Sequence, residues 1–288
     1  MIEGMGNGLR TSVVRKVCKY ALIYFIVVVG LIWTLFPVYW MVKTSFTPDK
    51  LMYDSKPELI PSQVTLKHYR ELFQTTEFMG NIKNSLYVSL LSTSISLAIS
   101  IFGSYSLTRL RFRGRRFILN SIIISYLMPA AVLFIPMYVL VSNLGLNDNK
   151  FGLLVIYPTF IVPYCCYMLL SYFRQIPLSL EEAAMIDGCT RLQTLWKIVL
   201  PIAAPGIAVV ASFAFTLSWN EFLYALVVTS SPSQQTVTIG INSFKFSDSF
   251  MWGLLMSSSV IASIPVLILY LGAQSFVIGG LTDGGVKY

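Results

Sequence analysis

The segment with the clearest chemical character runs from Ile176 to Pro201 and mixes charged residues with very small ones. Ala183, Ala184 and Gly188 carry little or no side chain, so another protein could approach the backbone closely along that side. The same segment carries five charged and four large apolar side chains: Glu181, Glu182, Asp187, Arg191 and Lys197, and Leu192, Leu195, Trp196 and Ile198. A short projection of this composition suits insertion into a cleft on a partner protein.

Local sequence rules predict two helices within this segment. Two capping boxes, each a hydroxyl residue followed three positions later by Glu or Gln, predict helix starts at Ser179–Glu182 and Thr190–Gln193. Gly188 lies between them, where glycine tolerates the left-handed backbone of a helix end. Pro201 is expected to end the second helix. We therefore expect a helix, a glycine turn and a second helix over about residues 179–200.

The composition of the rest of the chain indicates that membrane-spanning helices must position this helix pair. Of 288 residues, 55% are hydrophobic and 12% are charged, and the mean hydropathy is +0.69. A soluble protein of this length has about a quarter of its residues charged, so the favoured solvent here is lipid. Crossing the hydrocarbon layer takes about 20 apolar residues, and a helix satisfies its own backbone there. Six stretches qualify: Tyr20–Trp40, Asn84–Leu107, Phe117–Val141, Phe151–Phe173, Ile202–Val228 and Leu254–Ile278.

The predicted fold is therefore all-α: a polytopic membrane protein with six transmembrane helices over residues 20–280. The helix pair lies between spans four and five. Pro129, Pro136, Pro158, Pro163 and Pro265 are expected to kink spans three, four and six.

Basic residues predict the orientation of the spans. Positive loops stay on the cytoplasmic side, and two segments are strongly basic. These are the N-terminal residues Arg10, Arg15, Lys16 and Lys19, and the link with Arg109, Arg111, Arg113, Arg115 and Arg116. This places residues 1–19, the helix pair and residues 281–288 in the cytoplasm. The net charge of +8 then reflects topology and contact with lipid phosphates, and nucleic acid is disfavoured as a partner.

Several kinds of active site are excluded by what the sequence lacks. It contains no GxxxxGK[ST] phosphate-binding loop, so ATP cannot be held in that way. His68 is the single histidine, and the four cysteines form no CxxC pair, which argues against a hydrolytic triad or a zinc site. We expect Cys165 and Cys166 to act as small apolar residues. The chain is therefore not expected to be an enzyme or to hold a cofactor, and its energy source must be another polypeptide.

At this point the sequence resembles a known family. Glu182, Ala183, Ala184, Gly188, Ile198, Leu200 and Pro201 match the EAA motif of ABC-importer permeases in full. Four further stretches resemble the maltose-type, carbohydrate-uptake branch: the approach to span two with Ile60–Pro61, Tyr69 and Asn84–Leu86, then Ser104–Arg116, Ser218–Phe222 and Gly280–Lys287. Arg113 precedes Gly114 where many relatives have a proline, which is a minor departure.

The resemblance implies a fold, partners and a location. The fold would be that of a type I ABC-importer permease, in the cytoplasmic membrane of a bacterium. A second permease subunit, two ATPase subunits that bind ATP and magnesium, and an extracytoplasmic binding protein would complete the transporter. Glu182 would meet a basic residue of the ATPase, and residues 283–288 would reach between the ATPase subunits. The substrate would be a sugar, in particular an oligosaccharide.

Two other functions stay open at this stage. The same machinery could import glycerol phosphate, a polyamine or an amino acid, because the docking motif does not separate these solutes. An ion-coupled secondary carrier would need acids within the membrane and internal repeats. Glu221 is the one acid expected deep in a span, and no clear repeat is present.

Candidate substrate contacts lie on the fifth span. Ser212, Thr216 and Asn220 follow one another at four-residue spacing and form a polar stripe next to Glu221. These residues could line the path of the sugar, or Glu221 could instead hydrogen-bond to a neighbouring helix. Serines at helical spacing on span two, from Ser85 to Ser100, are expected to pack against another helix.

The outer loop between spans five and six is polar and aromatic. Phe244, Phe246 and Trp252 are candidates for contact with the binding protein. An interfacial segment lying on the membrane would explain the same aromatic residues.

Overall fold

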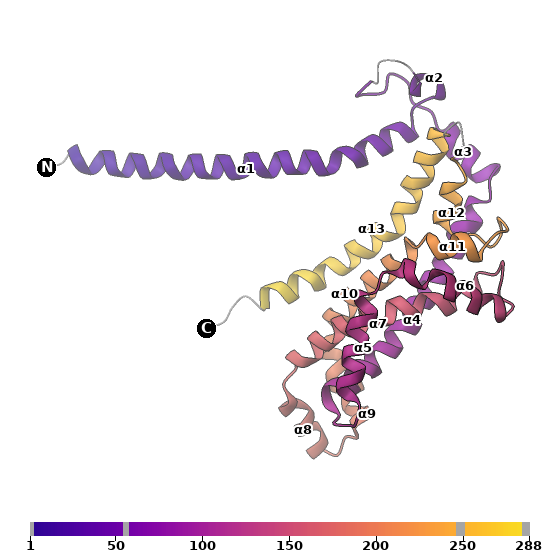
Figure 1. The fold of residues 1–288 in the computed structure, drawn as a ribbon. Helices are drawn as coiled ribbons and strands as arrows, with labels where there is room; N and C mark the ends of the chain where they lie inside the picture. The colour runs from indigo at the N-terminus through magenta and orange to yellow at the C-terminus, as the bar shows by residue number, and fades with distance from the viewer. Residues whose placement is uncertain (1–2, 54–57, 246–250, 284–288) are drawn as a thin grey trace.

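The computed structural model describes residues 3–53, 58–245 and 251–283, and it confirms the all-α fold. The helices are α1 (Glu3–Ser45), α2 (Asp49–Met52), α3 (Lys67–Gln74), α4 (Phe78–Arg109), α5 (Arg115–Leu127), a 3-10 turn (Ala130–Leu133), α6 (Phe134–Asn143), α7 (Phe151–Gln175), α8 (Leu178–Ile186), α9 (Arg191–Thr194), a π-helical segment (Leu195–Val199), α10 (Leu200–Trp219), α11 (Leu223–Val228), α12 (Val237–Asn242) and α13 (Trp252–Asp283). Figure 1 shows α4, α5, α7 and α10 side by side in one bundle, with α8 and α9 at one end of it.

Within the described residues, five helices are long and apolar enough to cross a membrane: Cys18–Ser45, Phe78–Arg109, Phe151–Gln175, Arg191–Trp219 and Trp252–Gln274. The predicted third span is instead a broken pair, α5 and α6, bent by 94°. The break falls at Met128, whose extended backbone precedes Pro129. A residue before proline is pushed out of the helical region, so the proline interrupts this span rather than only kinking it.

The predicted end of the second docking helix at Pro201 is wrong. The chain is helical from Arg191 to Trp219, so the docking segment continues directly into the fifth span through the π-helical segment. Pro201 lies just after the π-helical segment, a local departure from α-helical hydrogen bonding of the kind that accommodates a proline within a continuous helix. This span ends at Trp219, earlier than predicted, and a short break precedes α11.

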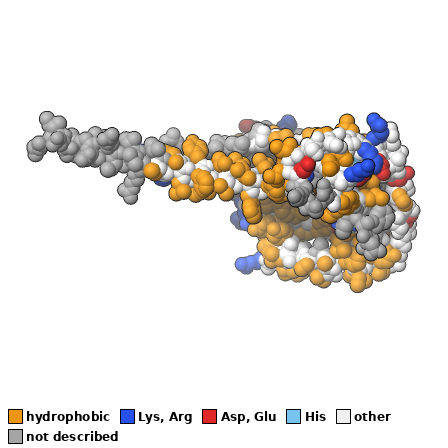
Figure 2. All heavy atoms as spheres, turned by 90° about the horizontal axis from the view of Figure 1, so that it is seen from above, with side chains coloured by type: hydrophobic (Ala, Val, Ile, Leu, Met, Phe, Trp, Pro, Cys, Tyr) orange, Lys and Arg blue, Asp and Glu red, His pale blue; other side chains and the backbone are white. Residues whose placement is uncertain are grey.

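Helix α1 extends away from the bundle over most of its length (Figure 1). Its membrane-spanning part is not buried by the rest of the chain, and side chains such as Trp33 are 83% exposed. Figure 2 shows hydrophobic side chains along α1 and over much of the visible face of the bundle. Apolar surface of this extent requires lipid or another protein around it.

Helices α4 and α7 form the centre of the bundle. The α4 serines at helical spacing from Ser85 to Ser100 are buried, as expected for close helix packing, and Ser100 and Ser104 bond to the facing backbone. Ser100 Oγ donates to Val162 O at 3.3 Å and Ser104 Oγ to Cys166 O at 3.2 Å. Cys165 and Cys166 are buried in the same contact, which agrees with the small apolar role predicted for them. The two helices therefore offer a rigid support for the segments at their ends.

Candidate docking and coupling site

Helix α8 begins earlier than the sequence rules predict. It starts at Leu178 after Pro177, so Ser179 already lies within the first turn and is not the cap. The capping box predicted at Ser179–Glu182 is therefore wrong. Proline before the first turn pre-sets the backbone angle for a helix start, which replaces the need for a capping hydroxyl.

The turn after α8 forms as predicted, around a left-handed Gly188 with φ of 87°. The Gly188 N–H donates to Met185 O at 3.1 Å and the Cys189 N–H to Ala184 O at 3.0 Å. This pair of bonds is a Schellman motif, which satisfies the last carbonyls of the helix. Among the described residues, no atom lies within 4 Å of a Cβ built on Gly188, so any close approach there is to another molecule.

The capping box at Thr190 is confirmed. The Gln193 N–H donates to Thr190 Oγ1 at 3.3 Å, and the Thr190 N–H donates to Gln193 Oε1 at 2.8 Å. The two reciprocal bonds start α9 and fix its direction relative to α8.

The surface of this helix pair, which we call the docking face, is exposed and partly apolar. Ile186 is 86% exposed and Leu192 and Trp196 are more than half exposed. The predicted docking residues that are exposed are Glu182, Ala183, Asp187, Gly188, Arg191 and Pro201, whereas Ile198 is half-buried and Ala184 is buried. Large apolar side chains grouped at a projecting end are typical of a protein-binding surface.

Glu181 does not belong to the docking face. Its side chain is 4% exposed, and Oε1 lies 2.6 Å from Arg109 Nε. Oε2 accepts a hydrogen bond from the Tyr105 hydroxyl at 3.0 Å. The expected exposed position of Glu181 is therefore wrong: the first turn of α8 directs it inward, and its neighbour Glu182 faces out.

Arg109 connects three helix ends. It is the last residue of α4, and its Nη2 donates to Phe173 O at 2.9 Å and Ile176 O at 2.8 Å at the end of α7. Its Nε reaches Glu181 in the first turn of α8. A cation at a helix C-terminus and an anion near a helix N-terminus are both favoured by the helix dipole. We call Arg109, Glu181 and Tyr105 the inner cluster.

Burial makes the inner cluster sensitive to partial removal. The Arg109 side chain is 6% exposed, so neither charge is well solvated. Deleting one partner of such a pair costs about 3–5 kcal/mol, because the other charge stays buried without compensation. The sequence offered one signal: Tyr105 and Arg109 are four residues apart and therefore share a helix face. No feature of the neighbouring sequence indicates that Glu181, 72 residues further along the chain, is the partner of Arg109.

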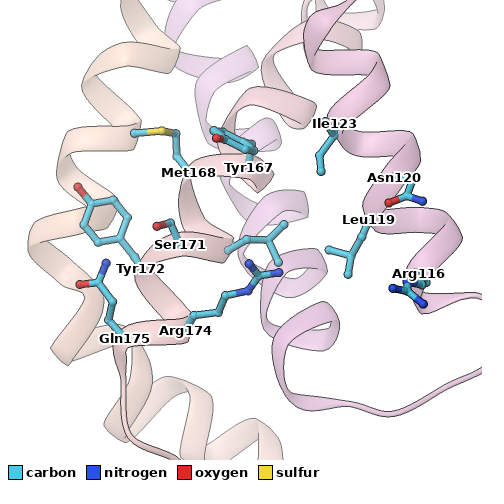
Figure 3. Close-up of a pocket in the computed structure, with 11 residues that line it drawn as sticks. Arg116, Leu119, Asn120, Ile123, Tyr167, Met168, Ser171, Tyr172, Arg174 and Gln175 are labelled. Carbon is cyan, nitrogen blue, oxygen red and sulfur yellow. The ribbon is translucent and has the colours of Figure 1, made fainter.

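The other residues of the basic link are arranged differently. Arg111, Arg113 and Arg116 are exposed, as lipid contact requires. Arg116 also lines an open groove of about 740 Å³ between α5 and α7, with Arg174 on the facing helix. Figure 3 shows the two arginines at the same end of the groove, with Tyr167 and Met168 further along it. Neither guanidinium forms an ion pair with another described residue.

Glu221 lies in the break between α10 and α11, not within a helical span. Its Oε1 accepts from the Tyr224 N–H at 2.9 Å, and its Oε2 accepts from the Ala225 N–H at 3.1 Å. The Tyr157 hydroxyl on α7 donates to Oε2 at 3.0 Å. The structure thus shows the hydrogen bonds to a neighbouring helix that were one of the two alternatives for this carboxylate.

The other predicted pathway residues differ in exposure. The hydroxyls of Ser212 and Thr216 donate to carbonyls one turn earlier in α10, at 2.9 and 2.7 Å, and are thereby satisfied within the helix. Asn220 is exposed and lines a groove of about 400 Å³ with Thr238 and Ser263. Asn220 is thus the member of this set that remains open to a solute.

Polar contacts at the opposite end of α4 hold the loop of residues 230–236. Asn81 Nδ2 donates to Pro232 O and Gln235 O, each at 3.1 Å. Asn84 Nδ2 donates to Ser233 O at 2.8 Å and Gln235 O at 3.0 Å, and Lys150 Nζ donates to Asn84 Oδ1 at 2.8 Å. We call Asn81, Asn84 and Lys150, with the carbonyls they bind, the outer cluster.

The candidate contacts with a binding protein are only partly on the surface. Phe244 is 7% exposed and packs against Phe78, with ring centroids 6.4 Å apart, so its expected surface position is wrong. The ring of Phe244 is part of a buried apolar cluster that includes Phe78, Leu72 and Trp219. Trp252 is 38% exposed, and Phe246 lies outside the described residues.

The described residues contain no group of three or more His, Cys, Asp or Glu side chains that could hold a metal ion. His68 is 2% exposed, and its Nε2 lies 3.0 Å from Thr47 O, which accounts for it as a structural residue.

Comparison with known proteins supports the same interpretation. Residues 95–278 match the family described as "Binding-protein-dependent transport system inner membrane component". The chain is 38% identical over 259 residues to the inner membrane ABC transporter permease protein YcjP of Escherichia coli, covering 89% of this chain and 92% of that one. It is 34% identical over 260 residues to the diacetylchitobiose uptake system permease protein DasC of Streptomyces coelicolor, covering 90% and 94%.

A solved structure shares the fold. A chain from a bacterial ABC transporter involved in the import of the acidic polysaccharide alginate matches with a TM-score of 0.74 at 24% identity, covering 88% of this chain and 95% of that one. The family match spans well over half of the sequence and includes the docking face and the inner end of α4. The chain therefore belongs to the family of inner-membrane components of binding-protein-dependent transport systems.

Proposed function

We propose that this protein is a permease subunit of an ATP-driven sugar importer, and that it forms one half of an oligosaccharide pathway working by alternating access. The observation that carries the proposal is the docking face. It projects from one end of the bundle, holds an exposed Glu182 beside Ala183 and Gly188, and continues without interruption into α10. Since the chain has no phosphate-binding loop, ATP hydrolysis belongs to separate subunits.

Exposed surfaces of the chain support the second permease subunit, the orientation in the membrane and the exit of the solute. The exposed apolar face of α1 supports a second permease subunit as partner within the membrane. The arginine-rich link beside the docking face supports a cytoplasmic location for that end and for both termini. The groove lined by Arg116 and Arg174 lies at the same end, where solute would leave toward the cytoplasm.

The proposal of a carbohydrate substrate rests on the similarity of this chain to sugar permeases. One relative is a permease for diacetylchitobiose uptake, and the motifs around spans two and five resemble the carbohydrate-uptake branch. Asn220 in one groove, and Tyr167 and Tyr172 in the groove between α5 and α7, offer the amide, hydroxyl and aromatic groups that bind sugars.

The test is uptake into vesicles that contain the permease pair, with its ATPase subunits inside and its binding protein outside. Radiolabelled trehalose, maltose and diacetylchitobiose are compared with glycerol 3-phosphate, spermidine and methionine. We expect uptake of a sugar that requires both ATP and the binding protein. Uptake of one of the other solutes alone would overturn the carbohydrate assignment, and uptake without ATP would overturn the importer mechanism.

A further inference from the structure

The inner cluster lies behind the docking face, where it joins the part of the protein that meets the ATPase to the part that crosses the membrane. Glu181 is one residue before Glu182, yet its side chain is buried and that of Glu182 is exposed. A displacement of the docking face therefore acts directly on the contact between Glu181 and Arg109.

We propose that Arg109, Glu181 and Tyr105 form a latch that makes α8 and the inner ends of α4 and α7 move as one body. This inference rests on the proposed function, since it assigns the residues that carry the movement from the docking face into the membrane. The three residues act by position and touch neither ATP nor solute.

The geometry gives the latch three independent attachments. Arg109 binds the carboxylate of Glu181 at 2.6 Å and also the two carbonyls at the end of α7. Tyr105, one turn earlier on α4, holds the second carboxylate oxygen at 3.0 Å. Both carboxylate oxygens are thus fixed, so α8 cannot rotate about its axis without breaking a charge-assisted bond.

The direct contact between α8 and α4 matters because the covalent chain connects α8 to a different membrane helix, α10. Along the sequence α8 leads through α9 into α10, which reaches α4 and α7 only through side-chain packing along the bundle. The latch adds a second connection, to α4 and α7, which pack closely against each other along the bundle. Helix α4 reaches the outer cluster at its other end, through Asn81 and Asn84. Movement at the docking face is thereby passed to the loop on the far side.

The test measures whether α8 and α4 move together. Spin labels are placed at Ser179 on α8 and Ile99 on α4, both exposed, after the four native cysteines are replaced by alanine. The complete transporter is studied without nucleotide and with ATP and vanadate. In the otherwise wild-type protein we expect the same narrow distance distribution in both states. A distance that changes between the states would overturn the latch.

Glu181→Gln removes the charge and keeps the size of the side chain. In this variant we expect the distance to broaden and to differ between the two states. Stimulation of ATP hydrolysis by the binding protein should fall about tenfold, the usual size of a coupling between sites. The matched control is Glu77→Gln, the same change on an exposed glutamate at the other end of α4 and outside the docking face, which should leave the distance narrow. An unchanged distance in the Glu181→Gln protein would overturn the proposal.

A double variant separates a latch from a pair that serves only stability. Arg109→Met with Glu181→Met leaves no buried unpaired charge, so thermal stability should recover toward wild type. The latch predicts that the distance stays broad and that stimulation stays weak despite this recovery. Return of rigid movement together with stability would show that the pair is structural only.

The outcome for the latch is distinct from that for the importer. If the proposed function fails, the ATPase subunits do not bind and the nucleotide-bound state is never reached. If the latch alone fails, the transporter still binds its ATPase and transports its solute in the variants.

Discussion

The two ends of α4 are both fastened to neighbouring segments, but by different chemistry. At the inner end a buried ion pair joins Arg109 to Glu181, and at the outer end the amides of Asn81 and Asn84 bind loop carbonyls. A neutral hydrogen bond contributes about 1 kcal/mol to stability, whereas breaking a buried ion pair by removing one partner costs about 3–5 kcal/mol. The contact between Arg109 and Glu181 is therefore expected to be harder to separate than any single bond of the outer cluster.

The largest effect is expected from breaking the inner cluster on one side. Arg109→Ala leaves Glu181 buried without its partner and should lower the free energy of unfolding by about 3–5 kcal/mol. Arg111→Ala, an exposed arginine two residues later, should change it by no more than about 0.5 kcal/mol. Thermal unfolding of the two purified variants makes the comparison. Equal stabilities would contradict the cost assigned to leaving one half of the buried ion pair without its partner.

Gly188→Val tests the docking face itself. A β-branched residue at φ of 87° strains the turn by about 1–3 kcal/mol and adds bulk where another protein must approach. We expect the ATPase subunits to stop co-purifying with the permease, with loss of uptake, while the external binding protein still binds its sugar.

The matched control for this variant is Gly114→Val. Gly114 has φ of 86° and the same open space around it, but it lies in the link before α5. Its strain should be similar, and co-purification should survive. Loss of the ATPase in both variants would mean that backbone strain alone, and not the docking face, explains the result.

A smaller effect is expected at the outer cluster. Asn84→Ala removes two bonds to the loop and the acceptor of Lys150, which should cost about 2 kcal/mol. Residues 230–236 should become more sensitive to added protease, with little effect on ATPase binding. Asn143→Ala, at an exposed position on α6, serves as the control. Protection of the loop in the Asn84 variant would contradict its role as the outer anchor.

The smallest effect concerns pH. Hydrogen bonds from the Ser231 hydroxyl and from the backbone N–H groups of Ser231 and Ser230 lower the pKa of Asp148 below its usual value of 3.8. A lowered pKa stabilises the folded protein above the unfolded value, and this contribution is lost as pH falls through the folded pKa.

Thermal unfolding of wild type and Asp148→Asn between pH 7 and pH 3 provides the measurement. The small difference between them should stay constant down to about pH 4 and then shrink. A difference that grows with acid would contradict the assignment of these bonds to the ionised form.

Sequence reasoning succeeded where local rules decide the structure. Gly188 and the capping box at Thr190 depend on a few adjacent residues, and both have the predicted form. The long apolar stretches of five spans were equally readable, because lipid enforces helices there.

It failed where packing between distant segments decides. Glu181 and Glu182 look alike in the sequence, and only the position of α4 makes one buried and the other exposed. Phe244 was assigned to the surface because its loop is polar, but Phe78 and its neighbours bury the ring. At Pro129 the sequence predicts a kink, whereas the extended backbone of Met128 before the proline breaks the span in two.

The central claim is that the tip of α8 is the surface on which an ATPase docks, and crosslinking tests it most directly. In a cysteine-free transporter, Ile186→Cys on the docking face is compared with Asn147→Cys on the outer turn, both exposed. A short thiol-to-amine crosslinker should join the permease to an ATPase subunit from Ile186→Cys alone, with a yield that changes on ATP binding. Absence of that product in an assembled, active transporter, or an equal yield from Asn147→Cys, would contradict the account.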